Sequence, residues 1–292
     1  MPSTLPFYVV NAFTTEAFRG NPAAIVFVNE TQLQDTSLLQ NIANNFGQPM
    51  TAFLHDRSTA SSAAFNVRWF TTVHEGALCG HATIASSGLL FSVPNVHSVA
   101  FGADVITYHT QSGIVVTARK VDEWIELTMP AAPTKSLPEE KTLQIGQIVS
   151  KALGKDVRVK FAGVGVGLFS ERLLVEIDVD DDLAGCVPKP QIFLETGYPI
   201  NIITSTSTDG SVAFLSRMFA PAFGIPEDHV CGSAHCSLTP YWANKSAKDG
   251  AELLAKQVSV RGGDIRTIWH EAEGTITLSG QIKVIMKGEM FV

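Results

Sequence analysis

The chain has 292 residues, which is long enough for two domains of ordinary size. Hydrophobic residues make up 45% of it and charged residues 17%, a globular composition that excludes a largely disordered protein. The formal net charge is −7 and no basic block stands out, which argues against nucleic acid as a partner.

The N-terminus and the cysteines predict a cytoplasmic protein. The longest apolar runs, such as PAAIVFV, are far shorter than the roughly 20 residues of a membrane-spanning helix. The first ten residues, MPSTLPFYVV, lack the basic region of a signal peptide and lead straight into a strand-like run. Four cysteines are too few for a disulfide scaffold, so we expect free thiols in a reducing compartment.

The first half of the chain alternates strand and helix patterns. Residues 7–28 predict two strands joined by a glycine-bearing loop. Apolar residues over 38–46 have helical spacing, and Gly47 fits the C-terminal stop of that helix. Residues 65–90, FNVRWFTTVHEGALCGHATIASSGLL, indicate a strand, a loop with Cys-Gly, and then a helix. Residues 108–130 predict a hairpin around a glycine turn and a further strand.

The second half repeats this order. Its segment FLSRMFAPAFGIPEDHVCGSAHCSLTPYWA again indicates a strand, a loop with Cys-Gly, and a helix. Arg68 and Arg217 are 149 residues apart and Gly80 and Gly232 are 152 apart, so a three-residue insertion precedes the second cysteine. Because several landmarks share nearly one offset, an internal duplication explains them better than chance similarity in a single domain.

We therefore predict two similar α+β domains that face each other. Residues 129–142, MPAAPTKSLPEEKT, are rich in Pro, Lys and Glu and are interpreted as the linker between them. The predicted domains are residues 1–132 and 133–292, with the last strand a candidate to cross back to the N-terminal domain.

Each Cys-Gly pair stands at the predicted start of an apolar helix. The first backbone N–H groups of a helix lack internal partners and its dipole is positive there, so the site favours a carboxylate and a thiolate. Two thiols on opposite faces of one carbon could remove a proton and deliver another, without metal or organic cofactor. The alternative is that cysteine and glycine are simply small residues that pack well where a helix begins.

Several motifs resemble the PhzF-like, or phenazine biosynthesis-like, family, which shares its fold with diaminopimelate epimerase. They are FRGNPAAIVFV, RWFTTVHEGALCGHATIAS, GIPEDHVCGSAHCSLTPYWA and VSVRGGDI, and the resemblance spans nearly the whole chain. It implies an α+β fold of two pseudo-symmetric domains, each a curled, mostly antiparallel β-sheet around a central helix, with the active site in the cleft between them. It also implies secondary metabolism and a homodimer.

The resemblance carries over residue by residue to a candidate site. Cys79 and Cys231 match the two cysteines of diaminopimelate epimerase. Phenazine-type isomerases instead use a glutamate, in whose place GQPMTAF has Met50, and methionine cannot carry a proton. The candidate catalytic residues are Cys79, Cys231, His81 and Asp228. The candidate substrate-binding residues are Asn21, Met50, Gly80, Gly232, Ser233 and Arg261.

Other roles remain open for some of these residues. His81 could bind substrate, act as a general acid or bond to backbone, and Asp228 could orient substrate or cap a helix. Glu75 and His74 could replace the missing glutamate, although a solvated loop also explains them. His235 and Cys236 lack the paired spacing of zinc ligands, so we expect packing residues and no metal.

The sequence therefore predicts a cofactor-independent isomerase or epimerase that acts on a small carboxylate-bearing metabolite. A second hypothesis is recruitment to rearrangement or cyclisation of a hydrophobic metabolite, in a cleft lined by Met50, Phe46 and Phe70. A third is a non-catalytic binding protein that keeps the fold.

Overall fold

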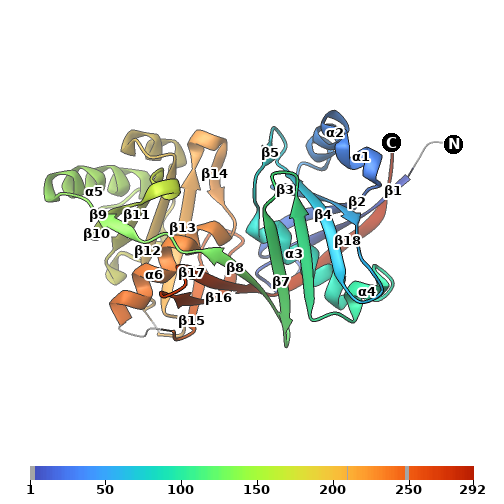
Figure 1. The fold of residues 1–292 in the computed structure, drawn as a ribbon. Coiled ribbons are helices and arrows are strands. Elements are labelled where there is room, and N and C mark those ends of the chain that lie inside the picture. Colours follow the sequence, from blue (N-terminus) through green and yellow to red (C-terminus); the bar gives the residue numbers. More distant parts are fainter. Residues whose placement is uncertain (1–3, 209, 247–249) are drawn as a thin grey trace. The chain divides into compact units, whose positions relative to one another are not determined.

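The computed structural model describes residues 4–208, 210–246 and 250–292 (Figure 1). Its internal contacts divide the chain into two compact units. Unit 1 consists of residues 1–128 and 279–292, and unit 2 consists of residues 129–278. The C-terminal segment therefore belongs to the same unit as the N-terminus.

The sheet of unit 1 begins with the two ends of its chain side by side. β1 pairs antiparallel with β18 on one edge and with β2 on the other, and β2 runs parallel to β3 (Figure 1). β4 is antiparallel to β3 and parallel to β6, after which β7 and β8 follow antiparallel. The strands are β1 (Thr4–Ala12), β2 (Asn21–Phe27), β3 (Met50–Asp56), β4 (Ala63–Phe70), β5 (Glu75–Gly76), β6 (Val105–Thr110), β7 (Val115–Val121), β8 (Trp124–Pro130) and β18 (Ile282–Phe291).

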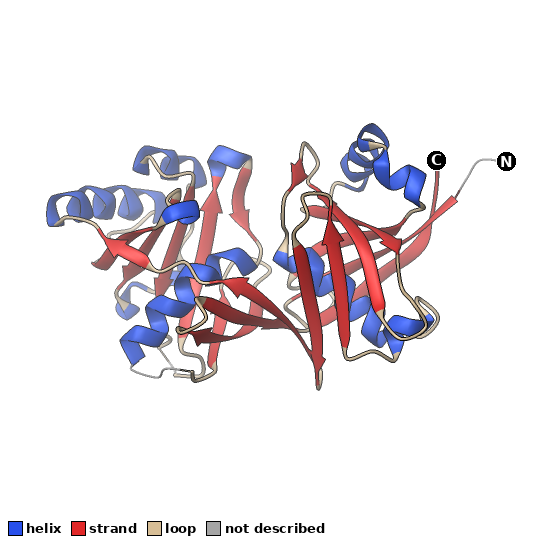
Figure 2. Ribbon diagram, viewed as in Figure 1, coloured by secondary structure: helices blue, strands red, loops and turns tan. Residues whose placement is uncertain are grey.

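The helix α3 (Gly80–Ser92) is the centre of unit 1. Every residue from 81 to 91 is buried, so this helix is enclosed on all sides within its unit (Figure 2). A Cβ atom on Gly88 would lie 2.5 Å from the Ile282 side chain of β18. Glycine at this position therefore lets the last strand approach the helix closely.

Two helices cover another part of the sheet of unit 1. α1 (Glu30–Gln34) and α2 (Thr36–Phe46) pack over a cluster that includes Phe53 and Phe70. α2 ends at Gly47, whose φ of 61° is in the left-handed region, which confirms the predicted helix and its stop. A short helix, α4 (Ser98–Phe101), precedes β6.

Unit 2 repeats the strand pairings of unit 1. β10 pairs antiparallel with β9 and β11, and β11 runs parallel to β12. β13 is antiparallel to β12 and β14 and parallel to β15, and β16 is antiparallel to β15. The strands are β9 (Thr134–Ser136), β10 (Val159–Gly165), β11 (Arg172–Ile177), β12 (Ile200–Ser205), β13 (Phe214–Ala220), β14 (Ile225–Asp228), β15 (Leu253–Gln257), β16 (Gly263–His270) and β17 (Thr275–Gly280).

The counterpart of α3 in unit 2 is α6 (His235–Ser246), which continues from the turn η6 (Gly232–Ala234). Its first eight residues are buried, except Tyr241, which is half-buried. The other short 3₁₀ turns of this unit lie on its loops. They are η1 (Gly167–Phe169), η2 (Val179–Asp181), η3 (Leu183–Gly185), η4 (Pro190–Thr196) and η5 (Pro221–Phe223).

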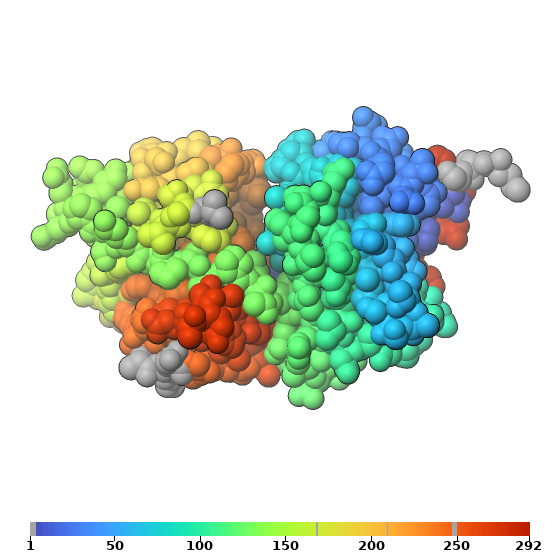
Figure 3. All heavy atoms as spheres, viewed as in Figure 1, coloured from blue at the N-terminus to red at the C-terminus, as the bar shows by residue number. Residues whose placement is uncertain are grey.

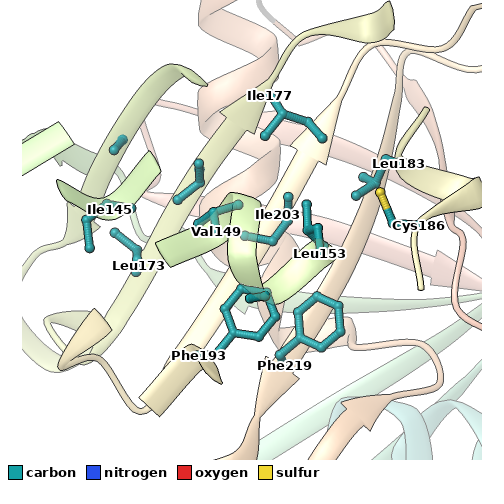
Figure 4. Packing of buried hydrophobic residues seen from close by; sticks show 13 residues of the cluster. Ile145, Val149, Leu153, Leu173, Ile177, Leu183, Cys186, Phe193, Ile203 and Phe219 are labelled. Atoms are coloured by element: carbon teal, nitrogen blue, oxygen red, sulfur yellow. The ribbon is translucent and has the colours of Figure 1, made fainter. Parts of the chain in front are cut away.

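The helix α5 (Glu139–Leu153) forms an outer layer of unit 2. Its inner face, with Ile145, Val149 and Leu153, packs on strand residues such as Leu173 and Ile203 (Figure 4). Its other face is exposed at the surface (green spheres in Figure 3). The interpretation of residues 129–142 as a linker is wrong in part, because this segment contains β9 and the first turn of α5. Glu139 and Glu140, which suggested a linker, instead complement the positive end of the helix dipole.

The predicted fold class is confirmed, since both units are mixed α+β, mostly sheet, and repeat one order of strand pairings with a buried helix inside. Over the described ranges, no helix combines the length and apolarity needed to cross a membrane.

Candidate functional site

In unit 1, the Cys-Gly pair lies between strand β5 and the central helix α3. Cys79 is the N-cap of α3, with extended backbone angles, and only 7% of it is exposed. Its Sγ lies 3.2 Å from Nδ1 of His81, which is on the first turn of the same helix. The Thr83 hydroxyl donates to the Cys79 carbonyl at 2.6 Å and fixes this turn. The thiol therefore has a ring nitrogen within hydrogen-bonding distance.

The Cys-Gly pair of unit 2 has the same placement but a different neighbour. Cys231 is the N-cap of η6 and is 5% exposed. Its Sγ lies 3.4 Å from Oγ of Ser233, which occupies the position that His81 has in unit 1. His235 Nδ1 lies 2.9 Å from the Cys231 carbonyl, where Thr83 donates in unit 1.

The environment of Cys231 keeps its proton on the sulfur. Burial, with the negative charge of Asp228 second, raises the pKa of the Cys231 thiol to about 12. The Ser233 hydroxyl, the positive charge of Arg172 and the Ala234 backbone N–H act against this shift. At neutral pH this thiol is therefore protonated.

A buried glutamine connects Cys231 and Asp228. Gln257, at the end of β15, accepts from the Cys231 backbone N–H at 2.8 Å and donates to the Asp228 carbonyl at 2.6 Å. The Asp228 carboxylate accepts from the Val230 backbone N–H at 3.1 Å. Asp228 is the last residue of β14 and caps the turn before the cysteine.

The glutamates before the two cysteines each pair with a buried arginine. Glu75 forms two hydrogen bonds with the buried Arg68, and Glu227 forms two with the buried Arg217. The expectation of a solvated loop is therefore incomplete for Glu75, which is exposed but held by this ion pair. It holds for His74, which is exposed and lies near the Thr71 hydroxyl.

The remaining candidates of unit 1 lie at element ends. Asn21 is buried at the start of β2, Gly80 is the first residue of α3, and Met50 is half-buried at the start of β3. The Met50 methyl group lies 3.8 Å from the place of a Cβ on Gly76 of β5. The expectation of a cleft lined by Met50, Phe46 and Phe70 is wrong for Phe70, which is fully buried in the cluster under α2. Phe46 packs against the same cluster and is half-buried.

The remaining candidates of unit 2 lie around the cysteine loop. Gly232 is buried in η6, and Arg261 lies in the turn between β15 and β16. Burial, and then the charge of Arg261, lower the pKa of His229, which places this arginine beside the loop of Asp228. The Ser259 hydroxyl of the same turn donates to the His229 carbonyl at 2.5 Å.

Sequence reasoning missed Arg172, at the start of β11. Its Nη1 donates to the Ser233 carbonyl at 2.5 Å, its guanidinium lies 4.6 Å from the centre of the Phe169 ring, and its charge lowers the pKa of Cys231. Nothing in the local pattern marks it, because a strand far from the Cys-Gly motif supplies it. His235 and Cys236 are fully buried, which confirms packing roles, and within the described ranges no three His, Cys, Asp or Glu residues form a metal-binding group.

The structure thus brings together two separate sets of candidates. In unit 1 it places Cys79 beside His81, and in unit 2 it gathers Cys231, Ser233, Asp228 and, through His229, Arg261.

Comparisons with known proteins agree with this fold. A family model described as phenazine biosynthesis-like protein matches residues 10–288. An uncharacterized isomerase of Halalkalibacterium halodurans is 35% identical over 290 residues, which cover 99% of each chain. The crystal structure of a PhzF-family phenazine biosynthesis protein from Enterococcus faecalis is 30% identical, covers 99% of this chain and 100% of its own, and has a TM-score of 0.84. A predicted epimerase of Pseudomonas aeruginosa, 18% identical with coverage of 98% and 99% and a TM-score of 0.71, shares the fold.

Proposed function

Because the chain belongs to the phenazine biosynthesis-like protein family, we propose that it is a cofactor-independent isomerase that moves a proton on a small carboxylate-bearing metabolite. The observation that carries this proposal is the pair of thiols, Cys79 and Cys231, at matched helix starts of two like units. The name isomerase borne by the bacterial relative supports the reaction class.

Cys79 is the group that takes the proton from the substrate. Its sulfur can pass a proton to Nδ1 of His81 at 3.2 Å, so a thiolate can form without exchange with bulk solvent. The start of α3 adds the positive end of a helix dipole, which favours the negative sulfur and a bound carboxylate.

Cys231 is the group that returns a proton. Its raised pKa, about 12, keeps the thiol protonated near neutral pH. Once it has donated its proton, the Ser233 hydroxyl and the positive charge of Arg172 stabilise the remaining thiolate.

The proposed step balances in protons and electrons. The bond between the α-carbon and its hydrogen breaks, the proton forms an S–H bond on Cys79, and the electron pair moves into the carboxylate as an enolate. Cys231 then donates its proton to the carbon from the other face, and the electron pair returns to form the new C–H bond. Backbone N–H groups at the helix starts stabilise the enolate charge.

The test is hydrogen exchange at carbon. The protein is incubated in D₂O with a panel of D- and L-α-amino acids and α-hydroxy acids, and deuterium at the α-carbon is followed by NMR. We expect exchange in at least one compound, and a loss of about 10³-fold or more in each of Cys79→Ala and Cys231→Ala, since neither thiol can replace the other.

Cys236→Ala is the matched control, because this thiol is buried in α6 with no role in the proposal. It should exchange at the wild-type rate. Exchange that persists unchanged in both Cys79→Ala and Cys231→Ala defeats the proposal.

A second candidate is rearrangement of a hydrophobic metabolite, and the observation that favours it is Met50 at the place of the family's glutamate. Met50 is half-buried at the start of β3, where it offers an apolar contact and no proton. Binding of apolar metabolites with no measurable exchange of the acid panel would favour this reaction.

A further inference from the structure

A buried arginine ties the cysteine loop of unit 1 to the layers beneath it. Arg68, on β4, is 4% exposed and forms hydrogen bonds of 2.8 and 2.7 Å with the two carboxylate oxygens of Glu75. The same guanidinium donates to the Leu33 carbonyl at 2.9 Å and to the Thr36 hydroxyl at 2.9 Å. One side chain therefore joins the sheet, the helices α1 and α2, and the loop of β5.

Unit 2 contains the same construction from different partners. Arg217, on β13, is 3% exposed and bonds to the two carboxylate oxygens of Glu227 at 2.7 and 2.9 Å. It also donates to the Leu183 carbonyl at 3.3 Å and to the Cys186 carbonyl at 2.8 Å. We call Arg68–Glu75 and Arg217–Glu227 the two arginine–glutamate clasps.

The spacing along the chain links each clasp to the cysteine that follows it. Arginine and glutamate are seven residues apart in unit 1 and ten apart in unit 2, so the three-residue insertion falls inside the clasp. From glutamate to cysteine the spacing is four residues in both units. The loop between the clasp partners has changed in length, whereas the distance along the chain from clasp to thiol has not.

A clasp of this kind is difficult to open. Both guanidiniums are buried, and a buried charge that loses its partner is strongly unfavourable, so each glutamate is held in place by the cost of separating the pair. The bidentate geometry also fixes orientation, which a single ion pair does not. Each guanidinium lies over the phenylalanine two residues further along its strand, at 5.0 Å from Phe70 and 5.6 Å from Phe219, which limits its movement further.

We propose that the two clasps are positioning devices for the thiols: Arg68–Glu75 holds Cys79, and Arg217–Glu227 holds Cys231, at the first turn of the buried helix of its own unit. The purpose of this arrangement rests on the proposed function, because proton transfer requires each sulfur to be held at a defined place. The residues of the clasps touch no substrate and act only through the loops that they fix.

The test measures each thiol separately. The intact protein receives a short pulse of iodoacetamide, and peptide mass spectrometry gives the alkylation rates of Cys79 and Cys231. Glu75→Gln keeps the shape of the side chain but removes its charge, and should raise the Cys79 rate about tenfold while the Cys231 rate stays unchanged. Glu227→Gln should do the reverse, so each variant is the control for the other.

Glu195→Gln is a further matched control, because Glu195 pairs with Lys151 at the exposed surface of unit 2. It should change neither rate. Urea midpoints are measured in parallel, since a general loss of stability would raise both thiol rates together. A rise in both thiols in either clasp variant, or in neither, overturns the proposal.

Thr36→Val is a milder variant that decides the question for unit 1 if Glu75→Gln does not fold. It removes one hydrogen bond to Arg68 and leaves the ion pair, and should raise the Cys79 rate two- to threefold only. An unchanged Cys79 rate in this variant counts against the clasp. Because thiol rates are read without substrate, failure of the clasp is distinguishable from failure of the proposed reaction, which the exchange of α-hydrogen tests.

Discussion

The two cysteine regions share one frame and differ in the groups that touch the sulfur. In both, a strand pair, an arginine–glutamate clasp and a buried helix fix the residue before the glycine. In unit 1 the sulfur meets the His81 imidazole, whereas in unit 2 it meets the Ser233 hydroxyl with Asp228 nearby. The comparison teaches that the duplicated parts position two thiols alike, while the variable parts give each sulfur a different polar neighbour.

A second difference lies beside each loop. Val67 pairs with Thr110 and Ser216 pairs with Gln257, so these two partners occupy equivalent places. The Gln257 amide reaches the loop of Cys231, whereas the Thr110 hydroxyl bonds to Ser112 and the Ile114 carbonyl in its own turn. Between this turn and residues 75–77, unit 1 has a pocket of about 390 Å³. The cysteine loop of unit 2 is therefore held by the Gln257 amide, whereas the equivalent side of the cysteine loop of unit 1 borders a pocket.

The largest effect expected from this comparison is in thiol reactivity. With its pKa raised to about 12, Cys231 has roughly 10³-fold less thiolate than an ordinary cysteine at pH 7.5. We expect iodoacetamide to alkylate it at least about 100-fold more slowly than Cys79, with a tenfold rise per pH unit between pH 7 and 10. Pulse labelling with peptide mapping measures both rates. Equal rates for the two thiols at neutral pH would break the comparison.

The next largest effect is in stability. Gln257→Met leaves the Cys231 N–H and the Asp228 carbonyl without this partner inside the protein, which should cost about 3 kcal/mol of the free energy of unfolding. Its counterpart Thr110→Val, in a turn that is partly exposed, should cost less than about 1 kcal/mol. Urea titration of both variants, followed by hydrogen exchange in each unit, measures the difference. Similar costs in the two variants would contradict a unit 2 loop that is held more tightly.

The smallest of these effects is a pH dependence confined to unit 2. His235 and Thr83 both bond to the carbonyl of their cysteine, but only histidine titrates. Burial lowers the pKa of His235 from 6.5 to about 4, so as the pH falls the unfolded chain binds this proton first. The stability that neutral His235 gives the folded protein is therefore fully present above pH 6.5 and is lost as the pH falls toward 4. The free energy of unfolding should drop by about 2 kcal/mol between pH 7 and 5 from this group.

His235→Gln should remove this part of the slope of unfolding free energy against pH, measured by urea titration with hydrogen exchange of α6. The exposed His74→Gln is the control and should leave the slope as it is. A slope that His235→Gln does not reduce would show that this histidine is not held neutral by burial.

The sequence predicts the frame well because the frame is built from local patterns. Hydrophobic periodicity and Gly47 locate α2, and the repeated Cys-Gly motif locates both helix starts, since each depends on neighbours along the chain. The duplication is visible for the same reason. It extends to the strand pairings, which follow one order in both units.

The contacts of the candidate site were less accessible from sequence. Arg68 reaches Leu33, and Gln257 reaches Asp228, across many residues that carry no periodic signal. The expectation that Phe70 lines a cleft is wrong because alternation along a strand predicts two faces without saying which one a helix covers. One signal could have found the clasps: an arginine, a phenylalanine two residues on, and a glutamate four residues before cysteine occur in both halves.

The pairing of β1 with β18 has a consequence for how the protein is made. β18 is synthesised after the whole of unit 2, yet it lies against β1, and Ile282 fills the space over Gly88 of α3. While the nascent chain leaves the ribosome, unit 1 must therefore wait with one edge of β1 unpaired and its central helix partly uncovered, whereas unit 2 already has all of its strands. Vectorial synthesis thus reverses the order that the chain suggests, and the half that begins first is completed last.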